Sequence, residues 1–449
     1  MTELYSEKDN EFVAWYPACV NEEEAGAVWT KKRAAYYVHI PFCDAICDYC
    51  GFAVEALKGA STRSYLDALH REIERYGESG RLANYEFVCG HFGGGTPSAI
   101  PASDLLAVKS AIESHFDVKP ATELTVEVNP ISFTEEKGLA YAEGGVNRIS
   151  FGLQSFDDQT LRTIGRPHRA ADVERTLAVI RSVGFENYSL DLMYGVPGQS
   201  AEDLRRDLVK AVETGATHIS CFRLEIIPFT VLRLREGAGM LPERLSVEAL
   251  NEMDDLVSSF FVENGYNHYG AFNFAKPGFE SVHNEIAFAA PQGEYVGFGN
   301  SAYSYIAGHV YANHAGLGSY IEAVQAGRDP IALAHRADAH EEMSRYFVLG
   351  LKFFRVSRSG FSERFGLEPE FVFGEILDRL VGNDLLAIEA DDYVLTHTGR
   401  LFVNNVIKEF YVGESRGSRQ HLDFAPTLTA KQIEFYARKA GLSDAKASA

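Results

Sequence analysis

A regular alternation of strand-like and helix-like segments between residues 35 and 225 restricts the fold more than any other feature. Apolar or β-branched runs occur at 35–40, 86–92, 123–128, 148–153, 188–194 and 218–225. Apolar residues at helical spacing fill the segments 62–77, 103–116, 170–184 and 201–215 between them. Alternating βα units are typical of a parallel sheet covered by helices. The six units predict an α/β fold, a partial (β/α)6 barrel, with an open doubly wound sheet as the alternative.

The pattern changes toward both ends of the chain, which indicates further structural units. At 449 residues the chain exceeds the size at which one core stops growing. Residues 1–34 show weak periodicity and read as an N-terminal extension. Residues 35–335 are predicted to form the barrel and its extension, and residues 336–449 a C-terminal domain. A helix, a short hairpin and another helix there predict a small winged-helix-like α+β domain.

Charge and hydropathy exclude some classes of function. The 42 Lys and Arg against 63 Asp and Glu give a net charge of −21, which excludes a broad nucleic-acid surface but leaves room for a local basic pocket. No apolar run approaches the roughly 20 residues that span a bilayer, and the first residues are charged. We therefore expect a cytoplasmic protein that binds neither membranes nor nucleic acid and acts on a small molecule.

Unusual residues follow the predicted strands. The segment HIPFC follows the first strand and GGGTP the second, while Asn129, Gln154 and Tyr194 close the third, fourth and fifth. The carboxyl ends of parallel strands lie on one side of a sheet, where ligands bind in such folds. The sequence therefore predicts a single site that gathers glycines, cysteines and polar side chains.

Three of the six cysteines, Cys43, Cys47 and Cys50, form the pattern CxxxCxxC. A structural zinc site requires four ligands, and nothing nearby completes one, although His39 lies four residues upstream. A [4Fe–4S] cluster usually takes four thiolates, so three would leave one iron open to an amine and carboxylate chelate such as that of S-adenosylmethionine (SAM). Buried free cysteines, zinc with a distant ligand and a redox pair remain alternatives for this pattern alone.

The segments YVHIPFC, FGGGTPS, VEVNP, NRISFGLQSF, DLMYGVPGQ and THTGR, within residues 35–411, resemble the radical SAM superfamily. Within it they resemble the anaerobic coproporphyrinogen III oxidase-like group, which also contains heme chaperones, heme-degrading enzymes and class C methyltransferases. The resemblance implies that Cys43, Cys47 and Cys50 hold a [4Fe–4S] cluster and that SAM is cleaved reductively there. It also implies an external one-electron donor such as flavodoxin or ferredoxin.

The resemblance also implies roles for residues around the cluster. The methionine part, polar groups and ribose of SAM would be held by Tyr37, Gly94, Gly95, Thr96, Glu127, Gln154, Arg166, Asp191 and Glu225. A second SAM would lie near Tyr49 and Tyr303, with the segment 283–288 as a further lining. His283 and Tyr303 are then the candidate catalytic residues that move a proton.

Departures from the family patterns decide the reaction that we expect. Phe52 stands where the oxidase has a further cysteine, and HNEIAF at 283–288 replaces the HNxxYW of heme chaperones. Chaperones also begin close to the cysteines, whereas 42 residues precede Cys43 here. By elimination we expect transfer of a methyl or methylene group from a second SAM to an sp² carbon, as C-methylation or cyclopropanation. The alternatives are a tetrapyrrole decarboxylase, which would need a basic pocket, and a heme chaperone.

Overall fold

The computed structural model describes residues 32–57, 59–228, 230–289 and 293–412. Its main sheet runs in the order β14-β13-β12-β11-β1-β4-β5-β6-β7-β8-β10-β9. The strands are β1 (Lys32–Ile40), β4 (Tyr85–Gly94), β5 (Asp117–Val128), β6 (Arg148–Gln154), β7 (Tyr188–Tyr194), β8 (His218–Arg223), β9 (Asn267–Gly270), β10 (Asn273–Ala275), β11 (Glu294–Phe298), β12 (Tyr303–Ile306), β13 (His309–Asn313) and β14 (Ile331–Arg336).

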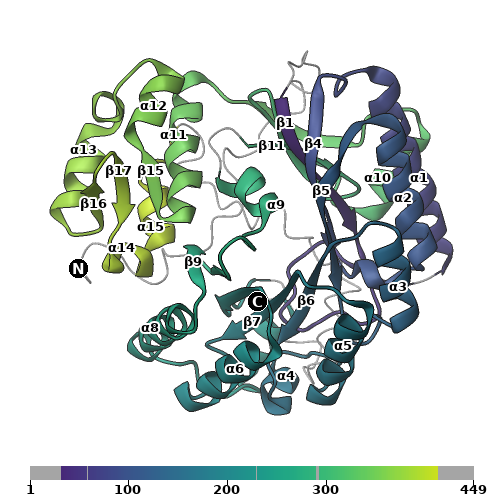
Figure 1. Cartoon of the computed structure of the whole chain (residues 1–449), viewed down its shortest axis with the longest axis horizontal. Helices are drawn as coiled ribbons and strands as arrows, with labels where there is room; N and C mark the ends of the chain where they lie inside the picture. The colour runs from purple at the N-terminus through teal and green to yellow at the C-terminus, as the bar shows by residue number, and fades with distance from the viewer. Residues whose placement is uncertain (1–31, 58, 229, 290–292, 413–449) are drawn as a thin grey trace.

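The six predicted strands are β1, β4, β5, β6, β7 and β8, and neighbouring strands among them pair in parallel. The α/β barrel fold is therefore confirmed (Figure 1). The sequence did not predict β11, which pairs in parallel with β1 on its other side. All five residues of β11 are buried, so this strand lacks the alternation that would have revealed it. Antiparallel strands β12, β13 and β14 extend that edge.

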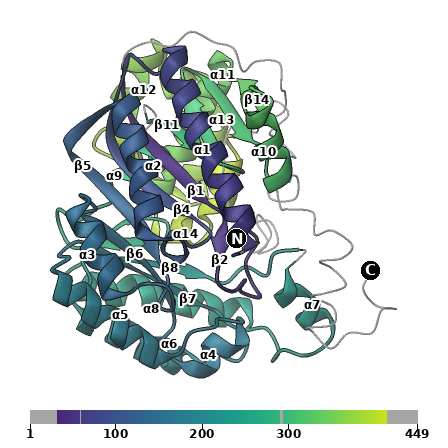
Figure 2. The ribbon, with the colours of Figure 1, turned by 90° about the vertical axis from the view of Figure 1, so that its right-hand side faces the viewer.

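Helices cover the outer face of the sheet, where α1, α2, α3 and α5 lie side by side in Figure 2. The helices of this part are α1 (Gly59–Ser79), α2 (Ala102–His115), α3 (Glu135–Glu143), α4 (Asp158–Thr163), α5 (Ala170–Val183), α6 (Ala201–Thr214), α7 (Val231–Gly237), α8 (Val247–Glu263), α9 (Val282–Asn284) and α10 (Leu317–Gln325). A short strand pair, β2 (Phe42–Cys43) with β3 (Glu55–Ala56), and a π-helical turn at Glu285–Ala289 complete it.

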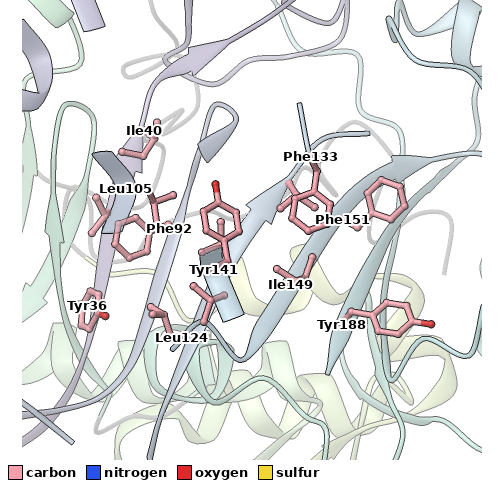
Figure 3. Close-up of a cluster of buried hydrophobic side chains, with 14 of the residues drawn as sticks. Tyr36, Ile40, Phe92, Leu105, Leu124, Phe133, Tyr141, Ile149, Phe151 and Tyr188 are labelled. Carbon is pink, nitrogen blue, oxygen red and sulfur yellow. The ribbon is translucent and has the colours of Figure 1, made fainter. Parts of the chain in front are cut away.

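The side chains of the parallel strands alternate between two environments. Apolar residues such as Tyr36, Phe92 and Phe151 point toward the helices and form one buried core, part of which is drawn in Figure 3. Their immediate neighbours along each strand, such as Tyr37 and His91, point to the other face. Successive side chains of a strand point to opposite faces of the sheet. When the apolar residues face the helices, the polar residues between them therefore face the inside of the barrel.

Residues after 338 form a smaller unit with its own buried core, which lies beside the barrel (Figure 1). Stacked aromatic rings hold it, for example Phe347 on Phe410 at 4.6 Å between ring centroids. Its antiparallel sheet has the order β15-β17-β16. The elements are α11 (Ala339–Gly350), β15 (Arg355–Ser357), α12 (Arg358–Phe365), α13 (Pro369–Gly382), β16 (Leu386–Glu389), β17 (Asp392–Leu395), α14 (His397–Leu401) and α15 (Val403–Lys408).

This unit matches the small α+β domain that the sequence predicts. The domain limits at 35–335 and 336–449 stay predictions. The N-terminal extension at 1–34 lies outside the described residues, except for 32–34, which open β1. Among the helices that the structure describes, none is both long enough and apolar enough to cross a membrane.

Candidate functional site

The inner face of the barrel and the C-terminal unit enclose a cavity of about 2020 Å³. Every residue that the sequence singles out as a ligand or catalytic candidate lines it: Tyr37, Cys43, Cys47, Tyr49, Cys50, Gly94, Gly95, Thr96, Glu127, Gln154, Arg166, Asp191, Glu225, His283 and Tyr303. Most of them come from β1, β4, β5, β6 and β7 and the segments that follow these strands, while Glu225 follows β8, His283 lies on α9 and Tyr303 on β12. The prediction of one shared site therefore agrees with the structure, while the individual roles stay predictions.

The cysteine segment is a short loop held from two sides. Its own turn is closed by a hydrogen bond of 3.2 Å from Cys50 N to Cys47 O. Asp48 N donates to Ile164 O at the end of α4, and Asp48 O accepts from Leu232 N of α7 at 2.7 Å. The Arg235 side chain donates to Asp48 Oδ2 at 2.9 Å. These contacts fix the loop backbone independently of any bound group.

The thiols of Cys43 and Cys47 accept hydrogen bonds, while burial disfavours the thiolate form of Cys43 and Cys50. Thr96 Oγ1 donates to Cys43 Sγ at 3.4 Å, and Arg166 Nη1 donates to Cys47 Sγ at 3.2 Å. Burial raises the pKa of Cys43 to about 11 and that of Cys50 to about 12. A metal that binds here must therefore displace protons, as thiol ligands require.

The spacing of the possible ligands indicates which kind of metal site the loop can form. No three His, Cys, Asp or Glu side chains of the described residues are placed to share a single metal ion. In a [4Fe–4S] cluster each thiolate binds a different iron, so three thiols that are not placed to share one ion can still hold a cluster.

The glycine run lies where two segments approach closely. Gly94 has a φ of +103°, and a Cβ there would lie 2.5 Å from the His39 ring. A Cβ on Gly95 would lie 2.7 Å from the carbonyl carbon of Pro41. Only glycine therefore allows the end of β4 to pack beside the segment that carries Cys43. This packing role accompanies the ligand contact that the resemblance implies.

Gln154 and Asp191 leave polar groups directed into the cavity. Gln154 closes β6 with a φ of +72°, unusual for a residue other than glycine. Its Oε1 is buried and has no hydrogen-bond partner among the described residues. Burial, then the nearby Glu127 charge, raise the pKa of Asp191 to about 7. These acceptors fit a ligand with hydroxyl groups, since buried polar atoms are seldom left unsatisfied.

Arg166 connects the cysteine loop with the end of β6. Besides Cys47, its guanidinium donates to the carbonyl of Gly152, while its Nε has no partner among the described residues. An arginine between the thiols and the polar strand ends fits an anionic group bound between them, because its planar fork matches a carboxylate. The residues present thus fit both a [4Fe–4S] cluster and SAM.

Histidines form a cluster that the sequence did not indicate. His91 Nε2 lies 2.9 Å from Glu127 Oε1, and the rings of His91 and His283 are 4.8 Å apart. Tyr37 stacks on His91 and hydrogen-bonds His39 Nδ1 at 3.1 Å. Burial, then the neighbouring His91 and Arg148, hold the pKa of His283 well below its usual range. His91 could have been found, because it lies two residues before Gly93 and so shares its strand face.

The short helix α9 presents His283 to the cavity. The Ser281 hydroxyl caps this helix by accepting from Asn284 N at 3.3 Å. The Glu123 carboxylate of β5 accepts from Val282 N at 3.1 Å and also pairs with buried Arg148. A carboxylate at a helix start satisfies the free N–H groups there. His283 is thus positioned by the strand that also carries Glu127.

Three further candidate SAM-binding residues, Tyr303, Tyr49 and Glu225, line the same cavity. Tyr303 on β12 packs in a small apolar cluster with Tyr295 and Tyr305. Tyr49 packs against Met193, and burial raises its pKa. Glu225 was predicted at the end of a strand, but β8 ends at Arg223 and Glu225 is exposed in the following segment.

Comparison with known proteins identifies the class. The family model described as the Radical SAM superfamily matches residues 37–210. The heme chaperone HemW of Bacillus subtilis is 34% identical over 381 residues, 83% of this chain and 98% of the relative. HemW of Lactococcus lactis is 33% identical, covering 86% of this chain and 98% of the relative. Similarity this high over most of both chains shows a shared family.

The chain belongs to the radical SAM superfamily, within its coproporphyrinogen III oxidase-like group. Within that group its curated relatives include the heme chaperone HemW, and HemW of Escherichia coli is 28% identical over 83% of the chain. The structure of coproporphyrinogen III oxidase (HemN) from E. coli matches with a TM-score of 0.75 at 23% identity. That match covers 85% of this chain and 90% of the other, and it supports the fold. Membership in this superfamily implies a [4Fe–4S] cluster and SAM.

The predicted methyl or methylene transfer is wrong. The HemW proteins of B. subtilis and L. lactis match over most of the chain, and the HemN structure that covers 85% of the chain is an oxidase. The prediction gave too much weight to the local segment at 283–288. This segment keeps the His and Asn of the chaperone pattern as His283 and Asn284, and a π-helical turn at Glu285–Ala289 follows them directly. Two changed aromatic positions do not outweigh similarity over the rest of the chain.

Proposed function

We propose that this protein is a heme chaperone that binds heme in the cavity between the barrel and the C-terminal unit. The observation that carries the proposal is the similarity over 83–86% of the chain to relatives called heme chaperones. The cavity supports it, because about 2020 Å³ exceeds the roughly 300–1,000 Å³ of an ordinary ligand pocket. It leaves space for a porphyrin beside SAM.

In this proposal the barrel wall holds the cofactors. Cys43, Cys47 and Cys50 bind the cluster, and Arg166 orients Cys47 through its hydrogen bond. Glu127, Gln154 and Asp191 bind the polar groups of SAM. When bound, the cluster supplies the electron that cleaves SAM, and an external donor such as flavodoxin or ferredoxin supplies that electron to the cluster. The second SAM near Tyr49 and Tyr303 was tied to methyl transfer and has no role in this proposal.

His283 is the candidate ligand for the heme iron. It lines the cavity, and its lowered pKa keeps the imidazole neutral, which is the form that binds metals. Glu123 and Ser281 fix the helix that carries it. The adjacent His91 ring and its partner Glu127 restrict how far the His283 ring can turn.

Heme titration of the cluster-loaded protein tests the proposal. We expect saturable binding of about one heme per chain with a shifted Soret band, since a specific pocket holds one ligand. His283→Ala should weaken binding about tenfold or more and move the Soret maximum, because an iron ligand is lost. His70→Ala, on α1 and outside the cavity lining, is the matched control and should change neither.

Two outcomes would overturn the chaperone proposal. One is the absence of any saturable Soret change in the wild-type protein. The other is turnover of coproporphyrinogen to carbon dioxide with formation of 5′-deoxyadenosine, which would favour the oxidase-type alternative.

A further inference from the structure

The cavity wall contributed by the C-terminal unit is cationic. Lys352, Arg400 and Lys408 line it together with the apolar Phe353, Phe354 and Leu401. Among the described residues of 339–412 that line the cavity, none is Asp or Glu. This concentration is unusual in a chain whose net charge is −21.

Lys352 is held at the junction of the two units. It is 8% exposed and lies after α11, and its backbone carbonyl accepts from Ala271 N at 2.9 Å. Burial, then the neighbouring Arg345, lower the pKa of Lys352 to about 7. Both effects disfavour the ammonium form, and an anion bound at this wall would favour it.

Arg400 presents a guanidinium in a way that suits recognition of a carboxylate. Its Cζ lies 4.5 Å from the centroid of the Phe354 ring, which supports the planar group from one face. No ion pair or side-chain hydrogen bond engages Arg400 within the part of the chain that the structure describes. A guanidinium stacked on a ring can still donate from the N–H groups along its edge. Two of these N–H groups can form parallel hydrogen bonds to the two oxygens of one carboxylate.

We propose that Lys352, Arg400 and Lys408 bind the carboxylate side chains of the porphyrin while Phe353 and Phe354 contact its ring. The inference rests on the proposed function, because heme is a planar apolar ring that carries two propionates. The opposite wall carries side chains of both signs, among them Glu127, Asp191 and Arg166. Arg166 already donates to Cys47 and Gly152, whereas the C-terminal wall offers Lys and Arg side chains as partners for acidic groups. The two walls together therefore orient the ligand by charge, with its acidic edge toward the C-terminal unit.

Comparison of hemin with hemin dimethyl ester tests this assignment, because the ester keeps the iron and ring but lacks the negative charges. The wild-type protein should bind hemin about tenfold or more tightly than the ester, as expected for charge-assisted pairs in a partly buried site. Arg400→Gln and Lys352→Met should each weaken hemin binding about fivefold or more and leave ester binding unchanged. The double variant should lose most of the preference for hemin, and Lys408 accounts for the part that remains.

Matched variants separate this effect from damage to the fold. Arg355→Gln removes an exposed arginine of β15 that pairs with Asp392 at 3.2 Å and does not line the cavity, so it should leave both affinities unchanged. Arg400→Lys should keep part of the preference for hemin that Arg400→Gln loses. Lysine keeps the positive charge but cannot donate two parallel hydrogen bonds to one carboxylate. Melting temperatures measured in parallel should stay within a few degrees of wild type for Arg400→Gln, whose side chain is on an exposed helix position.

The outcomes distinguish the two proposals. Equal affinity of the wild-type protein for hemin and its ester would overturn the cationic wall and leave heme binding intact. Variants that weaken hemin and ester alike would also overturn it. Failure of the wild-type protein to bind either ligand would instead overturn the proposed function.

Discussion

The two walls of the cavity are built by different means. On the barrel wall, side chains of both signs alternate with core residues along parallel strands, and Glu127, Asp191 and Arg166 lie close to the cysteine loop. On the C-terminal wall, cations stand among aromatic side chains on short helices and the turns between them. The barrel wall suits a fixed polar cofactor, and the C-terminal wall suits an apolar ligand with acidic substituents.

Removal of a cluster ligand should have the largest effect and should affect the barrel wall alone. Cys43→Ala, Cys47→Ala or Cys50→Ala should abolish the [4Fe–4S] chromophore after reconstitution, because two thiolates cannot hold the cluster firmly. Iron and sulfide analysis with the visible spectrum measures this. Full iron content in any of the three variants would refute the assigned ligands.

Cys89→Ala is the matched control for these variants. Cys89 is fully buried in the apolar cluster beside Tyr303 and does not line the cavity, so the cluster content should not change. Cys221 is a less clean control, because it lines the cavity. Cys19 lies outside the described residues.

Gly94→Ala tests whether the barrel wall depends on close backbone packing. The added Cβ would meet the His39 ring at 2.5 Å at a φ of +103°, so we expect destabilisation of about 2–4 kcal/mol in the free energy of unfolding. Gly184→Ala separates the two causes, because φ there is +88° but nothing lies within 4 Å of the new Cβ. It should cost only about 1 kcal/mol. Equal losses would mean that contact with His39 is unimportant. Denaturant unfolding measures both.

The barrel wall could be predicted from the sequence because each of its signals is local. Strand periodicity gives the face of the sheet, and Cys43, Gly94 and Gln154 mark the strand ends where a ligand binds. Only the glycines were considered at the end of β4, so His91 was missed. The alternation of side chains along β4 puts His91 on the inner face, where it contacts Glu127.

The C-terminal wall could not be predicted in the same way. Lys352 and Arg400 are separated by 48 positions in the sequence and lie in unrelated elements. Their common environment arises only when α11 packs into the separate aromatic core, Arg400 of α14 stacks on Phe354, and that unit meets Ala271 of the barrel. Short amphipathic segments show which residues are buried, but they do not show which cations face the same cavity. The net charge of the whole chain, −21, gives no sign of a local group of cations.

The pH dependence of heme binding should distinguish the two walls. The pKa of Lys352 is lowered to about 7 without ligand, and a bound carboxylate would raise it. Lys352 is therefore protonated below pH 7, whereas binding above that pH requires uptake of a proton. Hemin affinity should fall about tenfold between pH 6 and pH 8.5.

Two comparisons isolate this contribution. Lys352→Met should reduce the slope of the profile, and any slope that remains belongs to Asp191 of the barrel wall, whose pKa is also raised to about 7. Hemin dimethyl ester should show no such fall with the wild-type protein. All proteins compared carry His397→Gln, because His397 also lines the cavity, where it lies 3.2 Å from Asp255 of α8. A profile with the same slope in the presence and absence of Lys352 would assign the pH dependence to the barrel wall.

Gln154→Gly should give the smallest effect. It is a sharp test of the barrel wall, because it should raise the free energy of unfolding and weaken SAM binding at the same time. The φ of +72° is strained for glutamine and open to glycine, so unfolding should become harder by about 0.5–1 kcal/mol. The lost amide, whose Oε1 is buried without a partner among the described residues, should weaken SAM binding about fivefold, as measured by equilibrium dialysis. Gln154→Ala removes the same amide but keeps the strained backbone, so it should weaken SAM equally without the gain in stability. If Gln154→Ala proves as stable as Gln154→Gly, the positive φ at this position carries no measurable strain.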